Sequence, residues 1–400
     1  MKKTDVIIIG AGPAGSWLGF RLAQAGIESV ILEKEQFPRY KACGGGLSQK
    51  TIEFLPFSLD QIAERQMAGV WIGYKQRQVL VNRFGPAGAT VMRDTFDDFL
   101  VKKYLAAGGS FFDGQGANSV EETTDGIHVT ISGEVWHGRI LVGADGASSF
   151  VRRACGFGQH RALLFALAAE MKVAEEVMRS LGNYACFDLD AIPNGYGWIF
   201  PKRNHLSIGV LTSSHHFSLR EHLKRFCQSH PILRAGEIFR MRGSALPVGG
   251  YPRLVQRDRV VLVGDAAGTV EPFLGEGIYN ALLSADMAAD AIIAHLKHRK
   301  ALSVYSERLA RTVDANIVHA RRLAKIFYGH LPWTFPLLVQ NRIIARAFVC
   351  EVIGKSDFSA CLRYCLRRLP LFPFNYRQGI SNAKAFSVAP ASSEVDSAEA

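Results

Sequence analysis

The G-x-G-x-x-G pattern at residues 10–15 constrains the fold of this chain more than any other feature. An apolar run at residues 4–9 precedes the glycines and predicts a buried strand, and residues 13–25 have the pattern of a helix. A second apolar run follows at residues 28–33. Together these segments predict a βαβ unit, the setting in which the pattern binds a dinucleotide.

Each glycine of the pattern has its own physical role. Gly10 permits the tight turn after the strand, Gly12 lets the backbone approach a pyrophosphate, and Gly15 allows the helix to pack closely on the strand. The helix start offers unpaired N–H groups and a positive dipole end to the phosphates. Glu33 ends the second strand, where a carboxylate accepts hydrogen bonds from ribose hydroxyls. The sequence therefore predicts an N-terminal Rossmann-type domain.

The bulk composition is that of a globular protein. The 400 residues are 48% hydrophobic and 21% charged, which excludes a disordered or fibrous chain. No segment reaches the roughly 18–20 uninterrupted apolar residues of a transmembrane helix. The longest candidate, residues 331–339, contains Pro332 and Pro336, which predict breaks in the helix. The first apolar run ends in a glycine turn rather than a cleavage site, so we interpret it as a strand and not as a secretory signal.

The cysteine pattern indicates neither disulfide bonds nor a metal centre. The seven cysteines form no C-x-x-C pattern and no paired Cys/His set. We therefore expect neither disulfides nor a metal site, and a reducing, cytoplasmic compartment.

The net charge of +11 is concentrated in one region. Residues 297–377 contain fifteen Lys and Arg but only four acidic residues, so the rest of the chain is neutral. Large apolar residues such as Ile326 and Trp333 are interleaved with these charges. The pattern predicts peripheral contact with the inner, anionic face of a membrane, or alternatively solvated helix faces on a core. Nucleic acid is not an expected partner, because no nucleic-acid-binding module accompanies the charge.

Two further strand-to-turn segments indicate which dinucleotide binds. Residues 141–152 contain Gly-Ala-Asp-Gly, and residues 259–268 contain Gly-Asp-Ala-Ala-Gly. With the N-terminal glycines they resemble the three flavin motifs of the p-hydroxybenzoate-hydroxylase-like flavoproteins. The resemblance implies FAD as cofactor, with Asp265 bonded to the ribityl chain. It also implies that the helix starting near Gly277 and Ile278 points its positive end at the flavin ring, where charge develops on reduction.

Two more segments resemble the geranylgeranyl reductase family. Residues 37–48 contain Cys43-Gly-Gly-Gly46, and residues 193–201 contain Tyr196-x-Trp198-x-Phe-Pro. In the family the first segment lies beside the flavin and the second lines a substrate tunnel. The resemblance runs from residue 5 to about residue 290. One departure is visible, because the family's strand often continues to Gly-x-Gly and here reads Gly209-Val-Leu.

The same resemblance implies which residues contact FAD. Arg93 begins a predicted helix, where a cation can pair with phosphate, and Ala117 would offer backbone groups to the adenine end. The full implied set is Gly10, Gly12, Ala14, Gly15, Glu33, Cys43, Gly44, Gly46, Arg93, Ala117, Asp265, Gly277 and Ile278.

The catalytic candidates are Cys43, Tyr196 and Trp198. Cys43 is either an active-site thiol or a small buried hydrophobe. Tyr196 and Trp198 alternate with smaller residues, so both rings face one side of a strand, as a wall for an isoprenoid chain or as plain sheet core. We hypothesise hydride transfer from reduced FAD to a C=C bond of a geranylgeranyl or other polyprenyl chain. The proton donor stays open between Cys43, Tyr196 and a bound water.

The sequence predicts an α/β fold with three parts. A Rossmann-type FAD-binding domain, residues 1–158 and 251–296, is interleaved with a mixed-sheet substrate domain at residues 159–250. A basic helical region at residues 297–378 and a disordered tail at residues 379–400 follow.

Other functions remain compatible with these motifs. A monooxygenase or halogenase of the same fold would carry a related aromatic strand, and a flavin-bound carrier of prenyl lipid would carry out no reaction. A second G-x-G-x-x-G pattern is absent from the sequence. We therefore expect an external reductant, either NADPH visiting the flavin directly or an electron-donor protein.

Overall fold

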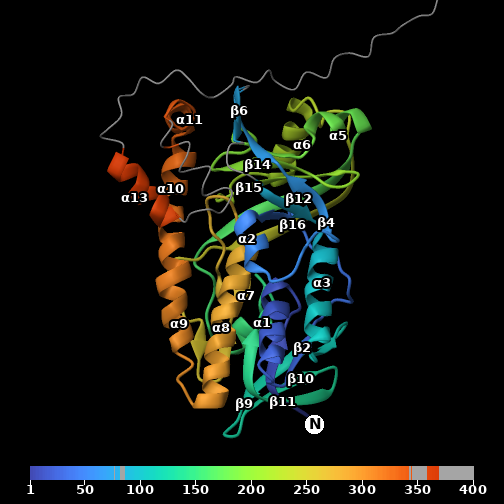
Figure 1. Ribbon diagram of the computed structural model, residues 1–400, viewed down its shortest axis with the longest axis vertical. Coiled ribbons are helices and arrows are strands. Elements are labelled where there is room, and N and C mark those ends of the chain that lie inside the picture. The colour runs from blue at the N-terminus through green and yellow to red at the C-terminus, as the bar shows by residue number, and fades with distance from the viewer. Residues whose placement is uncertain (76, 82–85, 342–343, 345–357, 369–400) are drawn as a thin grey trace, which may run out of the picture.

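The computed structural model describes residues 1–75, 77–81, 86–341, 344 and 358–368. Two large sheets organise these residues, one in the lower half of Figure 1 and one in the upper half. Helices cover the lower sheet, and a further set of helices stands along one side of the molecule. This arrangement agrees with the predicted α/β class.

The lower sheet is the Rossmann-type core. Its strands are β1 (Lys2–Ile9), β2 (Ser29–Leu32), β8 (Ser110–Phe112), β9 (Ala117–Glu122), β10 (Ile127–Ile131), β11 (Glu134–Gly143), β17 (Gln256–Arg257) and β18 (Val260–Leu262). The order is β17-β18-β11-β1-β2-β8, and the strands from β18 to β8 pair in parallel. β9 and β10 add to β11 as an antiparallel extension. β9 and β10 form a hairpin whose turn contains Asp125 and Gly126.

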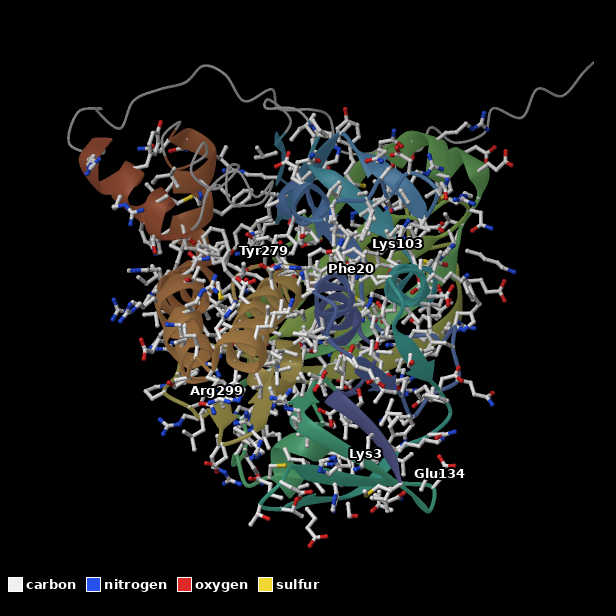
Figure 2. The ribbon with its side chains drawn as sticks, turned by 60° about the horizontal axis from the view of Figure 1, so that its bottom comes forward. Lys3, Phe20, Lys103, Glu134, Tyr279 and Arg299 are labelled. Carbon is white, nitrogen blue, oxygen red and sulfur yellow. The ribbon has the colours of Figure 1, made fainter. Side chains whose placement is uncertain are left out.

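Three helices lie side by side on this sheet in Figure 1: α8 (Ile278–His298), α1 (Pro13–Gln24) and α3 (Arg93–Ala106). Aromatic side chains fill the gap outside α1, since the Phe20 ring lies 5.0 Å from the Phe57 ring. Lys103 on α3 places its Nζ atom 5.0 Å from the same Phe57 ring, and Figure 2 shows Phe20 and Lys103 on adjacent helices. On the other side of α1, Arg21 Nη2 donates to Asp290 Oδ1 of α8 at 2.9 Å, so α1 is held between its two neighbours.

The upper sheet has seven strands in the order β16-β12-β15-β14-β13-β5-β6. These are β5 (Gly69–Tyr74), β6 (Arg77–Val81), β12 (Leu163–Lys172), β13 (Tyr184–Asp188), β14 (Gly195–Pro201), β15 (Leu206–Thr212) and β16 (Glu237–Pro247). The predicted range of 159–250 omits β5 and β6. β5 joins the sheet by pairing in parallel with β13, which is distant in sequence, so no local pattern reveals it.

Shorter elements connect the two sheets and cover the upper one. A third sheet has three strands in the order β3-β7-β4. The elements are β3 (Gly46–Ser48), α2 (Gln49–Phe54), β4 (Ala63–Met67), β7 (Gly88–Val91), α4 (Phe150–Ala154), α5 (Glu175–Leu181), α6 (Leu219–Ser229) and α7 (Gly264–Ala267). A second hydrophobic cluster joins α5 and α6 to one face of the upper sheet. The other face of that sheet is turned toward the Rossmann-type domain.

The C-terminal helices are α9 (Val304–Leu309), a π-helical turn at Ala310–Asp314, α10 (Ala315–Gly329), α11 (Leu331–Gln340) and α13 (Phe358–Arg368). The prediction that prolines break this region is wrong for α11, which contains both Pro332 and Pro336. Pro332 lies in the first turn, where its missing N–H costs no helical hydrogen bond, and only Pro336 removes one.

No helix among the described residues is both long and apolar enough to span a bilayer. The predicted disordered tail at residues 379–400 lies outside the described residues, as does part of the predicted basic region.

Candidate active site

A cavity of 770 Å³ opens between the two large sheets. Its volume falls within the range of about 300–1,000 Å³ that small-molecule and cofactor sites occupy. Every residue proposed above for the cofactor or the substrate lines it, with the exception of Gly15. The structure therefore brings together residues from eight separate segments of the chain in one place.

The glycine turn is shaped as the pattern requires. Gly10 has a φ of +103°, and a Cβ atom there would lie 2.5 Å from the Ala144 carbonyl oxygen. A Cβ atom on Gly15 would lie 2.0 Å from the Gly10 carbonyl oxygen, which explains why Gly15 packs below the cavity and does not line it. At Gly12 an added Cβ would meet no atom within 4 Å, so the backbone faces open space. This cradle fits a pyrophosphate at the start of α1.

Glu33 is anchored as well as placed. Its Oε2 atom accepts a hydrogen bond from the Ala11 N–H at 2.8 Å, and its Oε1 atom accepts one from the Glu35 N–H at 3.0 Å. The side chain is buried, yet Glu33 lines the cavity. Each carboxylate oxygen keeps a second lone pair for a ribose hydroxyl. Glu33 therefore fits the ribose role and also holds the glycine loop.

Lys41 is a residue that our sequence analysis missed. It lines the cavity together with Asp265, and a Cβ atom on Gly146 would lie 3.4 Å from its Nζ atom. Burial lowers the pKa of Lys41, and Arg93 lowers it further, whereas Asp265 raises it. A cation in this position suits the phosphates of a dinucleotide. The signal was available, because Lys41 lies two residues before Cys43.

Arg93 has a partner that the sequence did not predict. Its Nε and Nη2 atoms donate to both oxygens of Asp97, at 2.8 and 2.9 Å, and Arg39 lies 2.7 Å from the same carboxylate. Burial raises the pKa of Asp97, but the Arg93 and Arg39 guanidinium groups together hold it below its ordinary value. Asp97 leaves other N–H groups of the Arg93 guanidinium available. Contact between these groups and a phosphate stays a prediction.

The glycines at 44–46 pack against aromatic rings. A Cβ atom on Gly44 or Gly46 would lie 2.9 Å from the Phe200 ring, and one on Gly45 would lie 2.0 Å from the Val91 carbonyl oxygen. The Nζ atom of Lys202, which is fully buried, donates to the carbonyl oxygens of Gly44 and Val91, each at 2.8 Å. The glycines therefore form a thin backbone layer that packs against β14 beside the cavity, and Lys202 fixes the position of this layer.

The aromatic residues of β14 form one wall of the cavity. Tyr196, Trp198 and Phe200 line it, whereas Ile199 points into the second hydrophobic cluster on the far face. The alternation predicted from the sequence is therefore confirmed. Phe187 of β13 extends the wall, with its ring 5.1 Å from the Tyr196 ring.

Trp198 offers an unpaired indole N–H group to a ligand in this wall. Its Nε1 atom is buried and has no hydrogen-bond partner among the described residues. A Cβ atom on Gly44 would lie 3.0 Å from this nitrogen, so it faces the glycine layer beside the cavity. On the neighbouring strand, a Cβ atom on Gly209 would lie 2.2 Å from the indole ring, so the glycine is what admits the tryptophan.

The structure separates the candidate proton donors. The Tyr196 hydroxyl donates to the Leu274 carbonyl oxygen, and burial raises the pKa of Tyr196. Its proton is therefore committed to the backbone. Cys43 lines the cavity and is half-buried, and its Sγ atom accepts a hydrogen bond from the Gly45 N–H at 3.3 Å. Cys43 therefore remains a candidate, and Tyr196 is disfavoured.

A further group that could donate the proton, the Tyr40 hydroxyl, lines the cavity and was not predicted from the sequence. It donates to Glu170 Oε1 at 3.2 Å, and Glu170 Oε2 lies 3.2 Å from His205 Nε2. Glu170 is 1% exposed, and the ring of His205, also buried, lies 5.5 Å from the ring of the exposed Phe239. A sequence signal existed, because Glu170 interrupts the otherwise apolar strand β12.

Glu271 is a second buried carboxyl near this wall. It accepts hydrogen bonds from the backbone N–H groups of Phe273 and Leu274, and burial raises its pKa to about 8. Tyr196 is among the groups that interact with it electrostatically. At neutral pH this carboxyl is therefore largely protonated.

Comparisons with known proteins agree with the site. The family described as FAD binding domain matches residues 3–183. An uncharacterized protein of Methanosarcina barkeri is 32% identical over 347 residues, covering 85% of this chain and 87% of its own. A chloroplastic geranylgeranyl diphosphate reductase of Oryza sativa is 30% identical over 329 residues, covering 73% and 67% respectively.

Solved structures share the fold at lower identity. A geranylgeranyl bacteriochlorophyll reductase-like protein of Thermoplasma acidophilum superposes with a TM-score of 0.75 at 21% identity, covering 92% of this chain and 97% of its own. The flavin-dependent brominase Bmp2 also gives a TM-score of 0.75, at 19% identity, covering 92% and 100%. The fold is thus common to enzymes that catalyse different reactions.

The dinucleotide cradle, the family match and the relatives define an FAD-dependent oxidoreductase. Both curated relatives extend over most of the chain. The chain belongs to the geranylgeranyl reductase family, as the Cys-Gly-Gly-Gly and aromatic-strand segments indicated.

Proposed function

We propose that the protein reduces C=C bonds in a geranylgeranyl or related polyprenyl chain. When bound, reduced FAD supplies the hydride, and one proton completes the addition of two hydrogens across each bond. The observation that carries this proposal is the continuity of the cavity. The pyrophosphate cradle at Gly12 and the aromatic wall at Tyr196 and Trp198 line the same space.

The far end of the cavity is suited to a hydrocarbon chain. Small and apolar side chains from four strands of the upper sheet line the cavity together with the aromatic wall. These are Val70, Ala166, Ala168, Ala185 and Leu211. Such a surface favours an isoprenoid tail by the hydrophobic effect and excludes water. The rice relative, whose name refers to geranylgeranyl diphosphate, supports the same substrate class.

The aromatic wall has a second consequence for the reaction. An isolated C=C bond is a poor hydride acceptor, so positive charge must develop on the substrate as the proton is added. The faces of Tyr196 and Trp198 carry negative quadrupole charge and stabilise a nearby cation. The wall therefore binds the chain and lowers the barrier. Tyr40 and Cys43, which line the cavity, are the candidate sources of the proton, with the Glu170–His205 pair as a path to the surface.

The C-terminal helices support delivery of the substrate from a membrane. The outer surface of α10 and α11 exposes Leu323, Ile326 and Trp333, with exposed fractions of 40%, 57% and 77%. Arg322 and Lys325 are exposed on the same stretch. On the inner side of α10, the Tyr328 ring stacks on Tyr196 with centroids 6.4 Å apart. The helix thus connects a basic, apolar surface to the wall of the cavity.

Anaerobic single turnover tests the proposal. The purified protein is reduced with dithionite, mixed with geranylgeranyl diphosphate or a digeranylgeranyl lipid, and followed by flavin absorbance and mass spectrometry. We expect reoxidation of the flavin and a product heavier by one H₂ or more, without O₂.

Two outcomes would favour the other functions. Flavin reoxidation only on admission of O₂, with oxygen or halide in the product, would indicate a monooxygenase or halogenase. Absence of any flavin oxidation by prenyl lipids, despite their binding, would indicate a carrier. The 30% identity to a reductase favours C=C reduction over halogenation, because the brominase, at 19% identity, shares the fold alone.

A further inference from the structure

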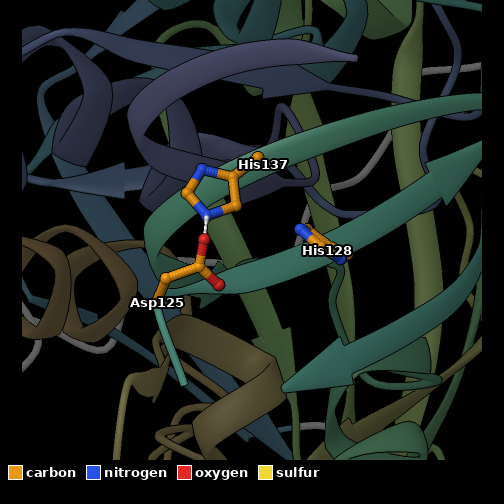
Figure 3. A group of neighbouring side chains, drawn as sticks. All are labelled: Asp125, His128 and His137. Atoms are coloured by element: carbon orange, nitrogen blue, oxygen red, sulfur yellow. Dashed lines mark ion pairs between the residues drawn. The ribbon is translucent and has the colours of Figure 1, made fainter. Parts of the chain in front are cut away.

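Three side chains of metal-binding type converge on the hairpin of β10 and β11. His128 and His137 are directly opposite each other on these antiparallel strands. Ile127, Val129 and Ile131 point into the core, so His128 lies on the outer face of the hairpin, and His137 shares that face. Asp125 comes from the turn just before β10. Figure 3 shows the carboxylate pointing at the His137 ring, with His128 beside them.

The donor atoms are close enough for one ion. One ligand atom from each of the three residues lies within 4.8 Å of the other two. Zn²⁺ binds imidazole nitrogen and carboxylate oxygen at about 2.0–2.2 Å, which places ligand atoms roughly 3.3 Å apart around a tetrahedral ion. The donor atoms therefore need to approach one another by up to about 1.5 Å, through rotation of the exposed Asp125 side chain and of the two imidazole rings.

The present contacts pair two of these donor groups with each other. Asp125 Oδ2 lies 3.4 Å from His137 Nε2, and this nitrogen has no hydrogen-bond partner among the described residues although it is buried. The other oxygen of Asp125 accepts a hydrogen bond from the Thr123 hydroxyl at 2.7 Å. Such a bond orients a metal-ligating carboxylate, and here it leaves Oδ2 directed at the histidines.

We propose that His128, His137 and Asp125 form a binding site for a divalent transition-metal ion, Zn²⁺ above all. Two imidazoles and one carboxylate are a ligand set that suits Zn²⁺, with water in the fourth position. None of the three residues lines the flavin cavity, so the ion is not a participant in the flavin reaction. It joins β10, β11 and the turn after β9, and so stabilises the end of the Rossmann-type sheet.

The cysteine spacing and the lack of a paired Cys/His set predicted no metal site, but this cluster contains no cysteine. The two histidines are nine positions apart in sequence, and only the hairpin register places them opposite each other. Lys3 pairs with His137 on the other side of β11, and Glu121 pairs with His128 on the other side of β10. These two neighbours have opposite charges, so they do not by themselves repel a cation.

Calorimetric titration with Zn²⁺ tests the site, using untagged holoprotein freed of metal with a chelator. We expect one ion bound per chain, and an affinity at least tenfold weaker in His128→Gln and in His137→Gln. The matched control is His216→Gln. His216 belongs to the exposed His215–His216 pair, whose rings are 4.0 Å apart, and its replacement should leave the affinity unchanged.

Flavin absorbance serves as the check that each variant is folded. If His137→Gln loses its flavin, His128→Gln and Asp125→Asn carry the test. Zn²⁺ should also raise the melting temperature of the wild type and of His216→Gln, but not of His128→Gln. Absence of binding to the wild type, or binding that survives in His128→Gln and Asp125→Asn, would overturn the proposal. So would binding that is lost in His216→Gln.

Discussion

The Nζ atom of Lys202 donates a hydrogen bond to the carbonyl oxygen of Gly44 at 2.8 Å, joining the end of the aromatic strand to the glycine layer beside the cavity. The same atom bonds the Val91 carbonyl oxygen at 2.8 Å. Burial lowers the pKa of Lys202 to about 8. One buried cation thus links three segments that approach the flavin site.

Replacement of Lys202 by Met should therefore loosen the site. The change leaves two buried carbonyl oxygens without donors, at a cost of about 1–3 kcal/mol each. We expect a holoprotein less stable by at least about 2 kcal/mol and weaker FAD binding, measured by denaturant unfolding and by titration of the apoprotein with FAD. Lys224→Met, on the exposed side of α6, is the control and should change neither. Unchanged FAD affinity in Lys202→Met would contradict the role.

Glu271 should make stability depend on pH. Its folded pKa of about 8 is above the ordinary value of 4.5, so the folded state holds the proton more tightly than the unfolded chain. Its contribution is fully present below about pH 4.5 and is lost as pH rises through 8, at a slope of about 1.4 kcal/mol per pH unit.

The variant Glu271→Gln removes this slope while keeping the acceptor for the Phe273 and Leu274 N–H groups. We expect the variant and the wild type to have similar unfolding free energies at low pH, and the variant to be the more stable at pH 8. Denaturant unfolding at several pH values gives the difference. Glu175→Gln, exposed on α5, should give no such trend. A difference that does not grow with pH would exclude a raised pKa.

The sequence predicted many of the residues that line the cavity, because that part of the cavity depends on local backbone shape. The glycine turn, Glu33 and the start of α8 each follow from a short pattern next to a strand or helix. The substrate domain was predicted less well. β5 joins its sheet through pairing with β13, and Glu170 meets Tyr40 across segments distant in sequence. Arg93 lines the cavity, but the flavin motifs do not predict Asp97, the carboxylate with which it pairs.

Leu211 should set the space available to the substrate. It lies opposite Tyr196 in the ladder between β14 and β15, where the family's strand often has glycine, and it lines the cavity. Leu211→Ala should widen the cavity and raise kcat/KM for the bulkier of two prenyl substrates relative to the slimmer one. A stability cost of about 2–5 kcal/mol is expected for a buried leucine.

The control for Leu211 is its neighbour Val210, whose side chain belongs to the cluster on the other face of the sheet. Val210→Ala should destabilise the protein without changing the substrate ratio. Equal substrate ratios in Leu211→Ala and the wild type would show that the wall opposite Tyr196 does not select the chain.

The two cavity tyrosines should respond differently to loss of the hydroxyl. The Tyr196 hydroxyl is bound to the Leu274 carbonyl oxygen, whereas that of Tyr40 is bound to the buried Glu170 carboxyl. If the proton passes through Tyr40, Tyr40→Phe should slow anaerobic flavin reoxidation by about 100-fold or more. Tyr196→Phe should keep the rate within a few-fold, because the aromatic face is retained. Similar rates for Tyr40→Phe and the wild type would direct the search to Cys43, tested by Cys43→Ala.

The basic surface of α10 should bind anionic membranes. Arg322 and Lys325 would each contribute about 1 kcal/mol near an anionic leaflet, and Trp333 and Ile326 offer the apolar contact. Arg322→Gln with Lys325→Gln should lower partitioning onto phosphatidylglycerol vesicles by roughly 30-fold, and neutral vesicles should bind both proteins weakly. The exposed Leu254, far along the chain from α10, provides the control Leu254→Ser, which should bind as the wild type does. Equal partitioning of the double variant and the wild type would show that these charges do not contact the membrane. The substrate would then have to reach Tyr196 by another route.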